Sequence, residues 1–194
     1  MSKLITDTIR HTGGSADNIT LDGSQNVTVE GNLTVDGTIV GGGKILQVVS
    51  GTHSDITSTT ATSWTDVDSD VTLNITPAST SSKIFVTGQL QGSCDNNAYA
   101  SVFRDSTNLI TATGSTNRIP AVRDYQDYDE AAYTTVLGVI NIVDSPSSTS
   151  ELTYKWRFYS RLGTTFTINR ADESTDAVYR VHPNTTLTLM EVSA

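Results

Sequence analysis

The sequence is poor in cysteine, in basic residues and in long apolar runs, and each shortage excludes a class of protein. Cys94 is the one cysteine, so no intrachain disulfide is expected and the fold is compatible with a reducing cytoplasm. Lysine and arginine total 12 against 21 acidic residues, and the formal net charge of -9 argues against binding of nucleic acid or anionic membranes. No run approaches the roughly 20 apolar residues of a membrane span, so neither membrane insertion nor secretion is expected.

Strong helix formers are also thinly used, which excludes an all-helical fold. Hydrophobic residues make up 36% and charged residues 17% of the chain, so the remainder is dominated by Ser, Thr, Asn and Gly. Thr and Val favour a pleated strand surface, while Gly, Asn and Ser supply turns. The composition therefore predicts an all-β protein, and its length allows one full domain with an appendage.

The chain is expected to consist of three parts. Residues 1–17 carry few large apolar side chains and a Gly13-Gly14-Ser15 break, which predicts an extended arm. Residues 18–43 form a glycine-punctuated repeat of the type apolar, Thr, apolar, acid, Gly. Residues 44–194 show short apolar runs separated by turn clusters, the pattern of a β-sandwich head.

The repeats predict a short intertwined β shaft. Alternate side chains of a strand share a face, so each repeat contributes a two-residue apolar stripe and then turns at its acid-Gly pair. Strands this short do not bury enough apolar area alone, and a trimer around a common axis covers the stripes and the strand edges. The alternative is a single meander packed on the head. The expected trimer core consists of Ile19, Leu21, Val27, Val29, Leu33, Val35 and Ile39.

Two strands of the head show which faces they bury. In 151–161, Leu152, Trp156 and Phe158 fall on one face and polar residues on the other, which predicts one core side and one solvated side. The segment 133–143 is apolar on both faces, so we expect a central strand whose second face meets another subunit. The last strand has the same character. The predicted head strands cover 45–50, 71–76, 83–91, 99–104, 133–143, 151–161, 164–169 and 185–192.

Several partial motifs lead to no cofactor or metal. Lys44 follows a glycine triplet but lacks the remaining residues of a phosphate loop. Asp66, Asp68 and Asp70 have the spacing that opens a calcium loop, yet Val71 and Pro77 stand where Gly and the closing Glu belong, so solvent-facing edge-strand residues are expected. The histidines are far apart in the sequence, and with a single cysteine they form no zinc spacing.

The segment 123–130 is the stretch most suggestive of a function. It places carboxylates and tyrosines between two predicted strands, a combination that serves glycan or protein recognition, calcium binding or glycoside cleavage. A solvated acidic loop is the simplest interpretation. The sequence gives no carboxylate separation and no partner for a raised-pKa acid, so no catalytic residue is assigned. The candidate recognition residues are Asp124, Tyr125, Asp127, Tyr128, Asp129 and Glu130.

The repeats and several head phrases resemble tail-fibre and other virion proteins of marine tailed bacteriophages, especially those that infect cyanobacteria. The phrases are 7–15 (DTIRHTGGS), 45–49 (ILQVV), 75–77 (ITP), 82–84 (SKI), 167–170 (TINR) and 187–192 (LTLMEV). The resemblance implies a homotrimer with a shaft and an antiparallel jelly-roll head similar to those of the tumour-necrosis-factor and complement families. It also implies an N-terminal arm anchored to other virion proteins.

These observations predict a virion protein that is made in the host cytoplasm and that, in the first two of three hypotheses, is not an enzyme. In the first hypothesis it is a short homotrimeric tail fibre whose head contacts a host surface glycan or protein. In the second it decorates the capsid or joins tail parts without contacting a receptor. In the third it is a glycan-degrading spike that uses Asp124, Asp127, Asp129 or Glu130. The first predicts a trimer with an exposed head.

Overall fold

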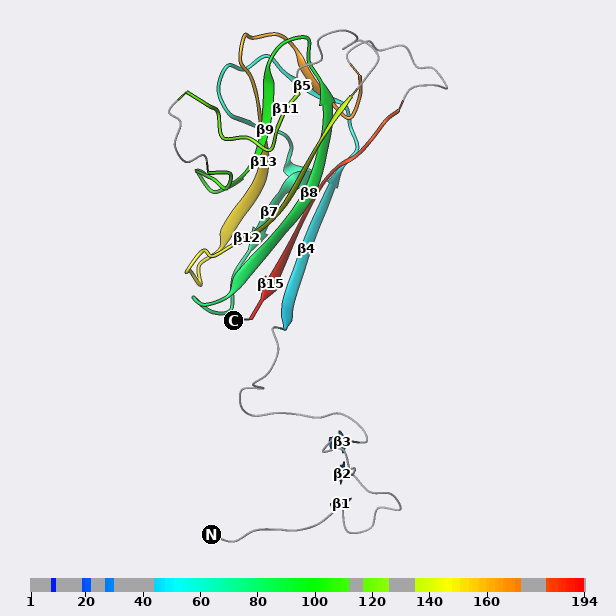
Figure 1. Cartoon of the computed structure of the whole chain (residues 1–194), viewed down its shortest axis with the longest axis vertical. Coiled ribbons are helices and arrows are strands. Elements are labelled where there is room, and N and C mark those ends of the chain that lie inside the picture. The colour runs from blue at the N-terminus through cyan, green and yellow to red at the C-terminus, as the bar shows by residue number, and fades with distance from the viewer. Residues whose placement is uncertain are drawn as a thin grey trace. The chain divides into compact units, whose positions relative to one another are not determined.

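The structure is a computed structural model that divides the chain into two units, Met1–Gly42 and Gly43–Ala194 (Figure 1). It describes residues 44–111, 117–125, 135–171 and 181–193, together with the backbone of three short strands before residue 30. The described residues contain β-strands and one 3₁₀ turn. The all-β prediction is therefore confirmed. None of them forms a helix long and apolar enough to cross a membrane.

The N-terminal unit contains a three-stranded antiparallel sheet in the order β1 (Thr8–Ile9), β2 (Ile19–Leu21) and β3 (Val27–Val29). Its register pairs Ile19 with Val29 and Leu21 with Val27. Successive strands thus pair with one another as a meander within one chain. Strand β1 lies inside the segment predicted as an extended arm and pairs with β2. The remaining predicted shaft residues, Leu33, Val35 and Ile39, lie outside the described residues, and the trimeric shaft stays a prediction.

The head contains two antiparallel sheets. The first, called the β8 sheet, has the order β4 (Ile45–His53), β15 (Thr185–Val192), β8 (Lys83–Ser93) and β12 (Val136–Asp144). Two short strands extend it, since β14 (Phe166–Ile168) pairs with the end of β8, and β5 (Thr57–Thr59) pairs with β14. Figure 1 shows the four long strands side by side.

The second sheet, called the β13 sheet, is built around β9 (Ala98–Arg104) and β13 (Leu152–Ser160). The outer edge of β9 pairs with β10 (Thr107–Asn108) and β11 (Arg123–Asp124). The outer edge of β13 pairs with β6 (Thr65–Asp66) and β7 (Thr72–Ile75), which flank the 3₁₀ turn η1 (Ser69–Val71). Each sheet is thus four strand positions wide.

The order of these positions is that of a jelly roll. The eight positions are numbered along the chain, and the pairs β4–β5, β6–β7, β10–β11 and β14–β15 each count as one position. The β8 sheet then has the order 1-8-3-6 and the β13 sheet the order 2-7-4-5. Successive positions thus alternate between sheets except for the hairpin formed by the fourth and fifth. The predicted jelly-roll sandwich of the head is confirmed.

The core lies between the two sheets and follows the alternation of the sequence. Strand β13 buries Leu152, Tyr154, Trp156 and Phe158 and leaves the residues between them partly exposed, as predicted. The Trp156 Nε1–H donates to the Thr186 carbonyl oxygen at 2.9 Å, which links the two sheets at the centre of the core. The β8 sheet contributes Ile84, Val86, Leu90, Ile140, Leu187 and Leu189.

All eight predicted head strands are present, within a few residues of the expected bounds. The predicted position of the 133–143 strand is wrong. Among the described residues β12 pairs with β8 alone, so it is an edge strand and not a central one. An apolar pattern on both faces indicates that both faces favour burial, but it does not say how many neighbours the strand's backbone has.

Candidate functional site

The outer face of the β8 sheet differs from an ordinary solvated sheet face in the side chains that it exposes. Its four long strands alternate, so that every second residue faces away from the core. Strand β12 exposes Leu137, Val139 and Val143 on this face and turns Gly138 and Ile140 inward. A solvated outer face ordinarily carries polar residues at such positions.

Part of this face forms a continuous apolar row across all four strands. The register places Val48 of β4 opposite Met190 of β15, Met190 opposite Phe85 of β8, and Phe85 opposite Val143 of β12. Val48 and Val143 are 56% and 62% exposed, and Phe85 and Met190 are half-buried. We call these four residues the apolar row. Ile45 and Leu46 lie beside its β4 end and are also exposed.

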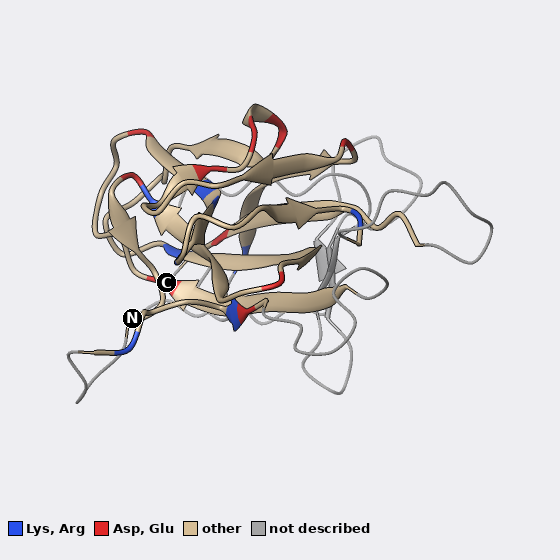
Figure 2. Cartoon of the chain, turned by 90° about the horizontal axis from the view of Figure 1, so that it is seen from above, with Lys and Arg blue, Asp and Glu red and all other residues tan. Residues whose placement is uncertain are grey.

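The same face carries little charge. Among the outward residues of β4, β8, β12 and β15, the charged one is Lys83, whose ammonium donates to the Ser145 hydroxyl at 2.9 Å. In Figure 2 the long strands are mostly tan, and the red acidic segments lie mainly at turns. Depletion of charge together with contiguous apolar side chains is typical of surfaces that bind another protein.

Strand β12 adds a second feature of an association surface. Its free edge has no partner strand among the described residues, and exposed edges usually carry charges or proline that prevent pairing with another chain. Here Val139 and Leu137 stand on that edge strand at 51% and 46% exposure. The expectation that this strand meets a further subunit concerns another copy and stays a prediction.

The predicted recognition residues lie partly outside the described residues. Asp127, Tyr128, Asp129 and Glu130 fall in the undescribed segment 126–134. Asp124 is exposed at the end of β11, and its Oδ2 accepts a hydrogen bond from Asn97 Nδ2 at 3.0 Å.

Tyr125 requires a correction, because it is a core residue and not an exposed recognition residue. Its side chain is fully buried, its ring lies 4.9 Å from that of Phe166, and its hydroxyl donates to the Leu90 carbonyl oxygen at 3.0 Å. Burial raises the pKa of this hydroxyl. Gly138 makes room for it, since a Cβ there would lie 2.1 Å from the Tyr125 oxygen. The aromatic ring of tyrosine is largely apolar, so burying it in the core is more favourable than exposing it among acidic residues.

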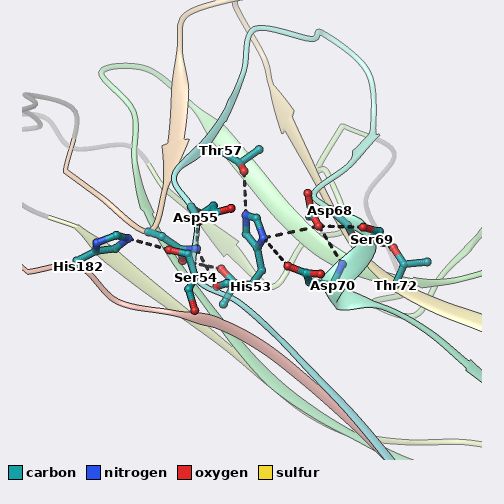
Figure 3. A network of polar contacts seen from close by, with 11 residues as sticks. His53, Ser54, Asp55, Thr57, Asp68, Ser69, Asp70, Thr72 and His182 are labelled. Atoms are coloured by element: carbon teal, nitrogen blue, oxygen red, sulfur yellow. Dashed lines mark hydrogen bonds and ion pairs between the residues drawn. The ribbon is translucent and has the colours of Figure 1, made fainter.

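A second constellation lies where β4 ends, beside η1 (Figure 3). His53 is 2% exposed, and its ring nitrogen Nδ1 lies 3.5 Å from Asp70 Oδ2 and 3.7 Å from Asp68 Oδ1. Its other nitrogen, Nε2, contacts the Thr57 hydroxyl at 2.8 Å. Within the described residues, His53, Asp68 and Asp70 form the group of His and acidic side chains that could hold a metal ion.

Local sequence features position both the two aspartates at η1 and His53 on β4. Asp68 caps the 3₁₀ turn by accepting from the backbone N–H of Asp70 at 2.9 Å, and this hydrogen bond lowers the pKa of the Asp68 carboxyl. On β4, Gly51 lets the turn approach, because a Cβ there would lie 2.0 Å from the Asp70 carbonyl oxygen. The close approach is therefore built into both segments.

The sequence pattern missed this constellation. The histidines are too far apart in the sequence to predict a zinc site, and the three aspartates were expected on an edge strand. Asp66 does lie on edge strand β6, where it pairs with Lys155 and Arg157. Asp68, however, caps η1 and Asp70 lies within it, and both face His53. The jelly roll brings them there by placing β4 in one sheet and η1 beside the other. No short-range spacing encodes such a contact.

No protein-family model and no curated protein sequence matches the chain. Among solved structures, one of the infectious bursal disease virus Gt strain matches with a TM-score of 0.36 and 12% identity, covering 91% of this chain and 48% of that chain. A structure of the Gx strain matches with a TM-score of 0.34 and 13% identity, covering 76% and 31%. This chain thus spans less than half of both viral chains. At these scores the likeness does not assign a function.

Proposed function

We propose that this chain is a non-enzymatic structural protein of a virion, a short homotrimeric fibre whose heads associate through the outer face of the β8 sheet. The observation that carries the association is the apolar row of Val48, Phe85, Met190 and Val143 on a face with little charge. The resemblance of the repeats and head phrases to virion fibre proteins supports the virion setting and the number of three.

The fibre role assigns different tasks to the two units. The N-terminal unit attaches the protein to other virion components, and the head is the part that contacts the host. Host contact by the candidate recognition residues Asp127, Tyr128, Asp129 and Glu130 gains from threefold presentation, because linked weak sites act at a high effective concentration. A reconstruction of the particle tests this part, since a head enclosed by other subunits does not reach a host.

The association is tested by light scattering on the full-length protein. The expected mass is about three times the chain mass of 20.7 kDa. Replacing Val48 and Val143 by aspartate puts charge into the apolar row at side chains that are already more than half exposed, so folding is preserved while association weakens. Burying an aliphatic side chain contributes about 1.5–3 kcal/mol, and each change is therefore expected to weaken association at least about tenfold.

The matched control is Leu162→Asp. Leu162 is 61% exposed in the turn after β13, on the other sheet, and its replacement is expected to leave the mass unchanged. A monomeric wild-type protein contradicts the proposal. If the Leu162 variant dissociates as readily as the Val48 and Val143 variants, general charge repulsion and not this face governs association.

A further inference from the structure

The contacts of His53 are unusual for a buried histidine. One side of the ring is satisfied by the Thr57 hydroxyl at 2.8 Å. The other side faces two carboxylate oxygens at 3.5 and 3.7 Å, whereas a charge-assisted N–H···O hydrogen bond is about 2.7–2.9 Å long. The Nδ1 atom of a buried histidine thus faces two carboxylate oxygens, and the nearer one lies at the outer limit of a hydrogen bond.

The same distances suit a metal ion placed between the three groups. Zinc binds histidine nitrogen at about 2.0–2.1 Å and carboxylate oxygen at about 2.0–2.2 Å in tetrahedral sites. Two ligands of such a tetrahedron lie about 3.4 Å apart. The three ligand atoms lie within 4.8 Å of one another, and the Asp70 side chain is 59% exposed, so a small rotation brings its oxygen into place.

We propose that His53 Nδ1, Asp68 and Asp70 bind a zinc ion, with water at the remaining position. Two carboxylates and a neutral imidazole balance the charge of a divalent cation. The nitrogen ligand favours zinc over calcium and magnesium, which take oxygen ligands. With the ion bound at Nδ1, Nε2 carries the proton and donates to the Thr57 hydroxyl 2.8 Å away, which is the outer hydrogen bond that metal-bound histidines usually make.

The surrounding chain holds the ligands in place without the metal. Asn169, which is buried, donates to the carbonyl oxygens of His53 and Asp55 at 3.0 and 2.9 Å and accepts from the Thr185 hydroxyl at 2.9 Å. The Asp68 oxygen that faces His53 also receives the Asp70 backbone N–H and the Ser69 hydroxyl. Figure 3 shows His53 at the end of β4 and Asp68, Ser69 and Asp70 at η1, facing one another.

An ion at this position joins the two sheets of the head. His53 belongs to the β8 sheet, while Asp68 and Asp70 lead into β7 of the β13 sheet. Because the ion binds the folded head and not the separated segments, it adds stability by mass action. At a hundredfold excess over its dissociation constant, zinc is expected to raise the melting temperature by about 5–10 °C.

The test is calorimetric titration of zinc into full-length protein treated with a chelator. One zinc per chain is expected. Asp70→Asn and Asp68→Asn should each weaken binding about tenfold or more. Both variants are expected to fold, because Asp70 is exposed and asparagine caps a turn as well as aspartate does. Cobalt added in place of zinc should give the visible absorption of a site with nitrogen and oxygen ligands, without a thiolate band.

Two controls separate this site from unspecific binding. Asp95→Asn removes the same charge from an exposed position outside the cluster, and His182→Gln removes an exposed histidine whose Nε2 contacts the Ser54 carbonyl oxygen. Both should leave the affinity unchanged. The rival arrangement is a protonated His53 that donates to the two carboxylates, and it predicts no zinc binding. Absence of binding, or binding that is lost only with His182, overturns the proposal.

Discussion

Replacement of Asp144 by asparagine is expected to destabilise the head strongly for a single isosteric change. Asp144 ends strand β12, and its carboxylate accepts from Arg104 Nη1 at 2.6 and 2.7 Å and from the Tyr154 hydroxyl at 2.6 Å. Both donors belong to the opposite sheet. For Arg104, burial alone would lower the pKa, but the hydrogen bond and ion pair to Asp144 outweigh it and raise the pKa.

The size of the loss follows from these contacts. Hydrogen bonds to charged groups contribute about 1.5–3 kcal/mol, and neutral ones about 0.5–1.5 kcal/mol. Asparagine keeps the shape but loses the charge for all three contacts, and the pair is only partly shielded, with Arg104 22% and Asp144 13% exposed. We therefore expect a loss of about 2–3 kcal/mol in the free energy of unfolding, or about 4–12 °C in melting temperature.

Urea unfolding of four variants tests this reasoning. Asp144→Asn, Tyr154→Phe and the double variant form a cycle, whose coupling is expected to be about 1 kcal/mol because the two residues share a hydrogen bond. Asp66→Asn is the control, since the same change at a 45% exposed ion pair should cost less than about 1 kcal/mol. Equal losses at Asp144 and Asp66, or no coupling with Tyr154, would refute the role given to this network.

Two further predictions concern β4 and β15. Gly51→Ala should lower the free energy of unfolding by about 1–3 kcal/mol, because its Cβ would meet the Asp70 backbone at 2.0 Å; an unchanged urea midpoint would contradict the close packing. For buried Glu191, burial alone would raise the pKa, but hydrogen bonds from Gln47 and Ala78 outweigh it and lower the pKa below 4.5. The folded state then binds fewer protons, so stability present above pH 4.5 is lost as the pH falls, and Glu191→Gln should flatten that loss in acid unfolding curves.

Much of the head was predictable because strand periodicity is local. The alternation in β13 and the apolar residues of β15 are visible in a few consecutive letters, and both strands occur where expected. The two- and three-residue strands β5, β6, β10 and β11 were missed. They are too short to show a period, and their pairing partners in β9, β13 and β14 define them.

The candidate sites were less predictable, because they depend on contacts between distant segments. Tyr125 follows Asp124 in a run of acidic and aromatic letters, yet the aspartate is exposed and the tyrosine is buried beneath Gly138. The excess of apolar residues in β12 was visible in the sequence. The alignment of its outward residue Val143 with Phe85, Met190 and Val48 was not, because it depends on the register of four strands.

By itself, the sequence determined an all-β chain, the positions of the long strands and the faces that they bury, because these follow from the alternation of neighbouring side chains. The tertiary structure decided which strands became neighbours and which residues met across the sheets. It placed β12 at an edge and brought His53 to Asp68 and Asp70, since packing of two twisted sheets joins segments that no local pattern connects.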